Sequence, residues 1–244
     1  MRFDVLTLFP EIFSGYLSQS ILNKAIENRL IEVQLHNFRD WTDDPHRKVD
    51  DRPYGGGPGM VLMVEPVVKA VEEIWNRISS QISLTCDAVT GQPASDGRQL
   101  VLLSPVGRPL VQPIVEELAT KQQILLMCGR YEGFDQRIID ILQPLELSIG
   151  DYIVNGGEVA AMVVIDAVSR LVPGVLGDES SGVHDSFSSG NRLLEYPQYT
   201  RPVEFRGHRV PDVLLSGNHE NIRVWREQQS RSLTEKRRKD LFGK

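Results

Sequence analysis

Residues 123–128 (QILLMC) constrain the fold of this chain more than any other segment. After Gln123 the run is apolar throughout and does not alternate with polar side chains, which is typical of a strand covered on both faces. Such strands belong to parallel sheets flanked by helices, and in those folds strands and helices alternate along the chain. The run therefore predicts an α/β fold, provided that the segments around it alternate too.

The surrounding segments do alternate over the first 172 residues. Strands are predicted where apolar residues alternate or β-branched residues gather, and helices where apolar residues recur every three or four positions. The predicted strands are 2–9, 31–36, 83–89, 99–103, 123–128 and 145–149. The predicted helices are 10–28, 66–78, 109–120, 135–142 and 157–171. This order predicts an α/β domain over residues 1–172 with a mostly parallel sheet.

The rest of the chain predicts a linker and a small second domain. Residues 173–217 are rich in Gly, Ser, Pro and Asp without a regular period. We place a flexible interdomain linker at 173–200, which is expected to order on binding. Basic helices are predicted at 218–229 and 234–242, so residues 201–244 form a small helical domain.

Charge is distributed unevenly between the two predicted domains. Residues 201–244 carry 11 lysines and arginines against 6 acidic residues, and the rest of the chain carries 16 against 27. An anionic partner for the basic tail explains this asymmetry, and so does a solvated helical face, which charge alone favours.

Several classes of protein are excluded or disfavoured by what the sequence lacks. No stretch approaches the roughly 18 apolar residues of a spanning helix, and Asp4 interrupts the N-terminus too early for a secretory signal. Cys86 and Cys128 lie apart among apolar residues, which predicts buried free thiols in a reducing cytoplasm. The histidines show no metal-ligand spacing, and no nucleophile elbow or phosphate-binding loop is present. The G-x-G-x-x-G spacing fails at Met60, which argues against a nicotinamide dehydrogenase.

Three glycine-containing loops follow predicted strands, at residues 103–107, 129–133 and 148–157. Open α/β sheets bind ligands at the carboxyl ends of their strands, so the loops are candidates for one ligand site. Their composition suits an uncharged heterocycle held by backbone groups rather than a triphosphate. A fourth glycine-rich loop, at 49–60, fits either a flexible surface loop or a substrate loop, and its charged residues favour the latter.

Nine motifs in order carry a resemblance to a known family. They are 8–11 (LFPE), 49–60 (VDDRPYGGGPGM), 129–133 (GRYEG), 148–152 (SIGDY), 155–158 (NGGE), 173–177 (PGVLG), 185–187 (DSF), 199–202 (YTRP) and 213–219 (VLLSGNH). Over about residues 1–240 the chain closely resembles the bacterial tRNA (guanine-N1)-methyltransferases, the TrmD family. The resemblance implies a SPOUT fold with a deep trefoil knot and an obligate antiparallel homodimer whose active sites use both chains.

The resemblance also implies a reaction. A methyl group would pass from S-adenosylmethionine to N1 of guanosine 37 in tRNA, when guanosine 36 precedes it, and the modification would prevent frameshifts. Asp185 would be the general base and Arg170 would stabilise charge on guanine O6, although the residues alone suggest only an Asx turn and a helix-end cation. Glu132 would act near a Mg²⁺ ion. No other metal site is implied.

Further residues are implied to bind the cofactor and the tRNA. The expected S-adenosylmethionine contacts are Leu103, Ser104, Pro105, Gly107, Gly129, Tyr131, Glu132, Gly133, Ser148, Ile149, Gly150, Asp151, Tyr152, Ile153, Val154, Gly156 and Gly157. The expected tRNA contacts are Asp50, Pro58, Gly59 and Arg201, and residues 173–190 would order when tRNA binds.

Two other functions remain open on the sequence. One is a different SPOUT methyltransferase that acts on ribose or on rRNA, which would not need a base at guanine N1. The other is a non-catalytic RNA-binding protein with a vestigial cofactor pocket, which would bind tRNA without transferring a methyl group.

Overall fold

The computed structural model describes residues 1–79, 97–177 and 185–243. They form two compact units, Met1–Gly177 and Asp178–Lys244. The predicted strand at 83–89 lies outside the described residues, and the role of residues 173–200 as a linker stays a prediction. None of the described helices is long and apolar enough to cross a membrane.

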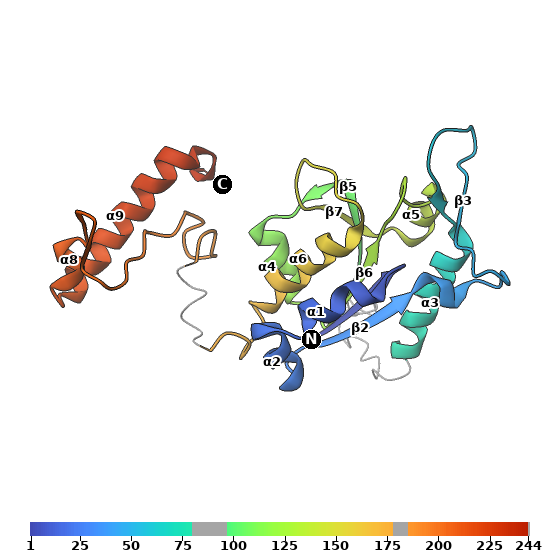
Figure 1. Ribbon diagram of the computed structural model, residues 1–244, viewed down its shortest axis with the longest axis horizontal. Helices are drawn as coiled ribbons and strands as arrows, with labels where there is room; N and C mark the ends of the chain where they lie inside the picture. The colour runs from blue at the N-terminus through green and yellow to red at the C-terminus, as the bar shows by residue number, and fades with distance from the viewer. Residues whose placement is uncertain (80–96, 178–184, 244) are drawn as a thin grey trace, which may run out of the picture. The chain divides into compact units, whose positions relative to one another are not determined.

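The first unit is built on a five-stranded parallel sheet (Figure 1). Its strands are β1 (Arg2–Thr7), β2 (Glu32–Asn37), β5 (Arg98–Pro109), β6 (Gln123–Cys128) and β7 (Leu145–Ser148). Their order across the sheet is β2-β1-β6-β5-β7, and every neighbouring pair is parallel. All six residues of β6 are buried, as the apolar run predicts. The predicted α/β class and parallel sheet are confirmed.

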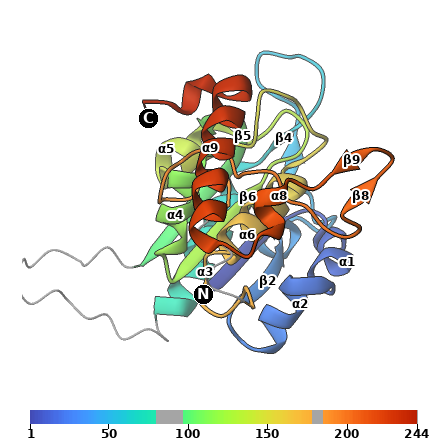
Figure 2. The ribbon, with the colours of Figure 1, turned by 90° about the vertical axis from the view of Figure 1, so that its left-hand side faces the viewer.

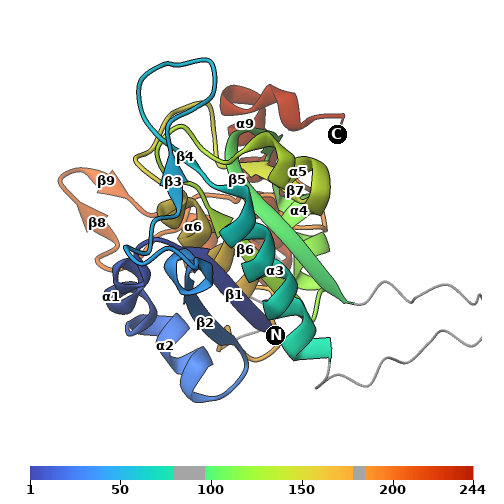
Figure 3. The ribbon, with the colours of Figure 1, turned by 90° about the vertical axis from the view of Figure 1, so that its right-hand side faces the viewer.

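Helices cover both faces of this sheet (Figure 3). One face packs against α2 (Ser20–Glu27), α4 (Gln112–Ala119) and α6 (Gly157–Ser169). The other packs against α3 (Val64–Ser79) and α5 (Gln136–Leu142). Along β6, Leu126 lies in the first core and its neighbours Leu125 and Met127 in the second, because successive side chains of a strand point to opposite faces.

Most predicted elements of the first unit differ from the structure by a few residues at their ends, and two differ more. The predicted helix 10–28 is divided into a 3₁₀ turn (Pro10–Phe13), α1 (Ser14–Leu17) and α2. Gln19 is extended and Ser20 has a φ of 56°, so the helical path cannot continue there. The predicted strand 99–103 runs on to Pro109, and its pairing with β7 shifts between Leu103 and Arg108.

The long segment between β2 and α3 is partly ordered by short elements. A 3₁₀ turn (Phe38–Trp41) packs on α3, and β3 (Asp50–Asp51) pairs in antiparallel fashion with β4 (Val61–Leu62). This pairing closes the glycine-rich loop at its base, as the light-blue loop of Figure 1 shows.

The second unit centres on one long helix, α9 (His219–Arg237), beside α8 (Asp212–Leu215) and a hairpin of β8 (Glu204–Phe205) and β9 (His208–Arg209) (Figure 2). A 3₁₀ turn, Lys239–Leu241, follows α9. The prediction of two helices at 218–229 and 234–242 is therefore wrong. Ser230, in the gap between the two predicted helices, and Thr234 are buried on α9 and hydrogen-bond to the backbone of Leu194.

A buried ionic cluster at the start of β1 makes the stability of the first unit depend on pH. Arg2, His36 and Gln123 donate hydrogen bonds to the fully buried carboxylate of Asp4. Burial raises the pKa of Asp4, but these hydrogen bonds outweigh it and bring the pKa from 3.8 to about 2.

Because the pKa is lower in the folded protein, the ionised Asp4 stabilises the fold above about pH 4 and loses this effect as the pH falls towards 2. The wild type should have a higher free energy of unfolding than Asp4→Asn at pH 6, and this difference should shrink by about 1 kcal/mol between pH 6 and pH 3. Denaturant unfolding of both proteins across this range measures the difference. A difference that does not change with pH would contradict the assignment.

Candidate functional site

The three glycine-containing loops meet at one edge of the sheet. Residues 103–107 belong to the second half of β5, whereas 129–133 follow β6 and 148–157 begin at the last residue of β7. The three strands are neighbours in the order β6-β5-β7. The Gly157 amide donates to the Gly129 carbonyl at 2.8 Å, and the Leu110 amide donates to the Ser148 carbonyl at 2.8 Å. The backbone of these loops therefore forms one connected surface at the place where parallel sheets bind ligands.

Two glycines make this close assembly possible. A Cβ atom at Gly107 would lie 2.5 Å from the backbone nitrogen of Leu147, and one at Gly157 would lie 2.7 Å from the Cα atom of Cys128. In both cases the obstacle is backbone and cannot rotate away. The sequence suggests only free amides at the start of a helix, whereas the structure requires glycine because two chain segments touch.

Gly157→Ala should therefore unfold the first unit or destabilise it by about 3 kcal/mol or more, because the methyl group overlaps the end of β6. Gly15→Ala is the matched control, since nothing lies within 4 Å of its Cβ position. Thermal unfolding followed by circular dichroism compares the two variants. Equal unfolding temperatures would show that β6 can shift to make room.

A second buried ionic cluster, around Glu158, links the second and third loops to β1. The carboxylate of Glu158 is 1% exposed, accepts a hydrogen bond from Thr7 at 2.6 Å and pairs with Arg130 at 2.9 Å. Arg130 also donates to the Asn155 carbonyl, and its guanidinium lies 4.7 Å from the centre of the Phe9 ring. Arg130 is therefore paired with a carboxylate 28 residues further along the chain.

The one cysteine among the described residues, Cys128, is not expected to react as a nucleophile. Cys128 ends β6 and is fully buried beside this cluster, and burial together with the charge of Glu158 raises the pKa of its thiol well above the usual value. A protonated buried thiol is a poor nucleophile, so covalent catalysis by Cys128 is not supported.

The glycine-rich loop meets the second loop within the same unit. The Glu132 amide donates to the Met60 carbonyl at 3.0 Å, and the Leu62 amide donates to the Gly133 carbonyl at 2.9 Å. Gly59 has a φ of 81°, and a Cβ atom there would overlap the carboxylate of Glu132. Glu132 and Gly59 thus lie together, while Asp50 is half-buried in β3 and Pro58 is exposed.

Glu132 alone does not make a metal site. Magnesium is usually held by one or two carboxylates together with substrate oxygens and water. In the described residues no group of three His, Cys, Asp or Glu side chains gathers that could hold an ion. We therefore derive no step of the reaction through a metal.

An apolar cavity of about 390 Å³ adjoins the third loop. Arg130 and Glu158 line it together with the exposed apolar side chains of Ile12, Ile153 and Val159. Exposed apolar side chains in this number around one cavity indicate a surface that another molecule covers.

Arg170 and Asp185 belong to different units. Arg170 is the exposed residue that ends α6, and it follows Val159 and Val163 on the solvent-facing side of the helix at helical spacing. Asp185 begins a turn in the second unit, where its carbonyl accepts from the Ser188 amide at 3.1 Å. Arg201 lies in the second unit as well, at a separate pocket.

Comparison with known proteins identifies the family. A family model described as tRNA (Guanine-1)-methyltransferase TrmD matches residues 1–244. A tRNA (guanine-N(1)-)-methyltransferase of Rhodopirellula baltica is 62% identical over 243 residues, which cover 99% of this chain and 94% of that protein. A protein of the same name from Geobacillus kaustophilus is 52% identical, covering 99% and 91%. One from Brevibacillus brevis is 51% identical, covering 100% and 92%.

The fold and the joined loops define an α/β protein whose loops meet at the carboxyl edge of a parallel sheet, the edge at which such folds bind ligands. With the match along its whole length, the chain belongs to the TrmD family of tRNA (guanine-1)-methyltransferases. It is therefore an enzyme of the methyltransferase class that modifies tRNA.

Proposed function

We propose that this enzyme transfers the methyl group of S-adenosylmethionine to N1 of guanosine 37 in tRNAs whose position 36 is also guanosine. The meeting of three backbone-lined loops at adjacent strand ends carries the proposal, because a neutral adenosine needs backbone partners and apolar walls rather than clustered cations. The relatives named above are methyltransferases of the guanine N1 position, which agrees with this reaction.

The three loops are the proposed S-adenosylmethionine site. Backbone groups of 103–107, 129–133 and 148–157 would hold the cofactor, which supplies the methyl group when bound. Val106 and Ile153 are each 83% exposed on these loops and offer apolar cover for a ring. The predicted trefoil knot at this site is part of the proposal.

Two side chains would carry the proton and the charge. Guanine N1 bears a proton and is a weak nucleophile until that proton leaves, so a carboxylate within hydrogen-bond reach is needed as a general base. We assign this role to Asp185. As N1 loses its proton, negative charge grows on O6, and the permanently charged guanidinium of Arg170 would stabilise it.

A homodimer would complete the site. The solvent-facing side of α6 presents Val159 at 53% exposure and Val163 at 41%. Ile12, on the 3₁₀ turn Pro10–Phe13, is exposed as well. A second copy of the chain would cover this apolar face, and Asp50, Pro58 and Gly59 would reach the target guanosine of the partner's site. The cytoplasm remains the expected compartment.

Val163→Glu should convert the dimer to a monomer, because the interface would have to bury an unpaired carboxylate. Ile141→Glu is the matched control, since Ile141 is 58% exposed on α5, which covers the opposite face of the sheet. Light scattering coupled to gel filtration measures the mass of each. A dimeric Val163→Glu protein would remove this face of α6 from the interface.

Methyl transfer to two tRNA transcripts tests the proposed reaction. One transcript carries guanosine at position 37 and the other adenosine, and both receive labelled S-adenosylmethionine. Label on the guanosine transcript alone, mapped to N1, is the expected result. Label on both points to another SPOUT methyltransferase with a ribose target, and label on neither points to an rRNA target or a non-catalytic RNA-binding protein.

A further inference from the structure

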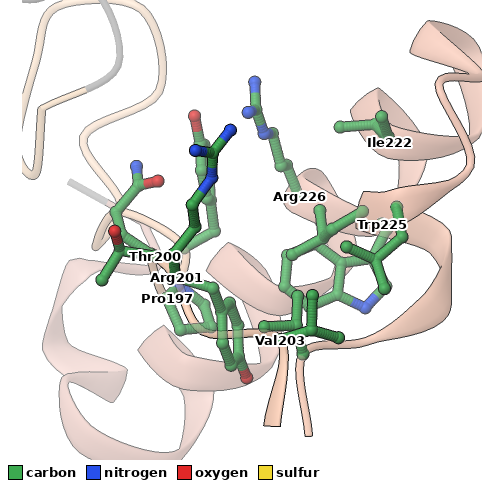
Figure 4. Close-up of a pocket in the computed structure, with 13 residues that line it drawn as sticks. Pro197, Thr200, Arg201, Val203, Ile222, Trp225 and Arg226 are labelled. Atoms are coloured by element: carbon green, nitrogen blue, oxygen red, sulfur yellow. The ribbon is translucent and has the colours of Figure 1, made fainter.

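A second pocket, of about 450 Å³, lies wholly within the second unit (Figure 4). The segment 196–203 forms one wall, and α8 and α9 form the other. Its volume falls within the roughly 300–1,000 Å³ that is usual for small-molecule sites. None of the residues assigned to the proton, to the charge on O6 or to the cofactor lines this pocket.

Aromatic and aliphatic side chains line the pocket. The rings of Tyr199 and Trp225 lie with their centres 6.3 Å apart at an angle of 56°, and Val203 and Ile222 add aliphatic surface (Figure 4). Tyr199 is 49% exposed. A flat ring entering the pocket therefore meets aromatic surface with which it can stack.

Two arginines supply positive charge at the same pocket. Figure 4 shows Arg201 and Arg226 extending in the same direction, away from the Trp225 ring. In the described part of the chain neither forms an ion pair, whereas Arg209 and Arg223 on the same unit pair with Asp212 and Glu220. Arg226 instead lies over the Tyr196 ring, 4.7 Å from its centre. Two cations without carboxylate partners leave the pocket ready for an anion.

We propose that this pocket binds one unstacked base of the substrate RNA, with the adjoining phosphate held between Arg201 and Arg226. The base stacks on Trp225 or Tyr199, and the guanidinium groups neutralise the backbone. RNA loops are recognised in this way, because unpaired bases offer a ring face and every nucleotide carries a phosphate. The proposal rests on the proposed function only in taking RNA as the substrate. It adds a base-binding site that is separate from the methylated guanine.

Fluorescence of Trp225 reports on the pocket directly. The probe is the tRNA transcript with guanosine 37, together with versions in which one nucleotide of the anticodon loop is made abasic. Subtracting the signal of Trp225→Phe from that of the wild type isolates the emission of Trp225. The intact transcript should quench this emission, and removal of one particular base should abolish the quenching and weaken binding about tenfold.

Removing the same base should have no further effect on the affinity of a variant that lacks the Trp225 indole. Trp225→Ala should weaken binding about tenfold, and the abasic change should cost nothing further in that variant, since both remove one contact. Trp225→Phe keeps a ring and should retain most of the affinity. Arg226→Ala leaves the aromatic surface intact and should also weaken RNA binding. It replaces Trp225→Ala in this test if Trp225→Ala proves unstable on heating.

Arg231→Ala is the matched control for charge. Arg231 is exposed on α9, five residues beyond Arg226, and so points to a different side of the helix. Its loss should leave the quenching and the abasic pattern unchanged. The proposal would be overturned if the losses of affinity from Trp225→Ala and from the abasic change added up, or if no single abasic change altered the quenching. It would also be overturned if Arg231→Ala, but not the pocket variants, abolished the quenching. Quenching that rises with protein concentration in the absence of RNA would assign the pocket to a second copy of the chain. Methyl transfer to guanosine 37 is scored separately, so its failure does not decide the pocket.

Discussion

Asp185→Asn should lower the turnover of methyl transfer by about 10²–10⁴-fold, which is the usual contribution of a positioned general base. The amide has nearly the same size as the carboxylate but cannot accept the N1 proton in the reaction. Binding of tRNA and of S-adenosylmethionine should change little, because the substitution removes a proton acceptor and no bulk. Single-turnover kinetics with the guanosine-37 transcript measure the step.

The surroundings of Asp185 make this substitution a clean test. The turn that follows Asp185 is anchored by the Ser186 hydroxyl, which accepts from the Glu195 amide at 2.9 Å, and by Arg192, which donates to the Phe187 carbonyl at 3.1 Å. Leu194, in the same segment, donates to the buried Thr234 on α9 at 3.0 Å. None of these three hydrogen bonds uses the Asp185 side chain, so they should persist in the Asn variant.

Asp212→Asn is the matched control. Asp212 is an exposed carboxylate of the same unit that pairs with Arg209 at 3.3 Å, and its loss changes the net charge by the same amount. Turnover of this variant should stay close to that of the wild type. Full activity of Asp185→Asn would remove the proposed base and favour a SPOUT methyltransferase with a ribose target.

The sequence predicts the sheet well because its signal is local. The apolar run of β6 and the strand–helix alternation follow from burial on two faces, and neighbouring strand ends then place the three loops together. The extension of β5 to Pro109 was missed, because its second half departs from the buried pattern and its pairing shifts before it meets β7 again. That pairing joins residues far apart in the sequence.

The buried cluster around Glu158 could not be predicted for the same reason. Thr7, Arg130 and Glu158 come from β1, from the loop after β6 and from the first turn of α6, and no spacing in the sequence relates them. An acidic residue in the first turn of a helix is ordinarily explained by the helix dipole at the surface. Only its burial shows that Glu158 ties two loops together. The continuity of α9 depends on contacts of the same kind, because the hydroxyls of Ser230 and Thr234 bind the backbone of Leu194.

Arg170→Ala should lower turnover by about 10²–10³-fold, the usual cost of removing one group that stabilises an oxyanion in the transition state. The affinity for S-adenosylmethionine should stay within a few-fold of the wild type, because Arg170 ends α6 and lies outside the three cofactor loops. Arg170 is exposed, and its amide bonds to the Asp166 carbonyl whatever the side chain, so the helix should end as before. The measurement separates turnover from the KM for the cofactor.

Arg170→Lys and Lys69→Ala decide what the loss means. Lysine keeps the positive charge but not the planar fork, so Arg170→Lys should recover part of the turnover if charge on O6 is what the residue stabilises. Lys69, on α3 of the same unit, is a partly exposed cation that pairs with Asp43 at 3.4 Å, and Lys69→Ala should leave turnover unchanged. A variant that loses turnover and cofactor affinity equally would point to a structural role at the end of α6.

The position of Arg170 beside exposed Val163, on the face that a second chain is proposed to cover, makes a further distinction. If dimer assembly were the cause, Arg170→Ala would be monomeric by light scattering, whereas a stabiliser of the transition state leaves the dimer intact and slows only the chemical step.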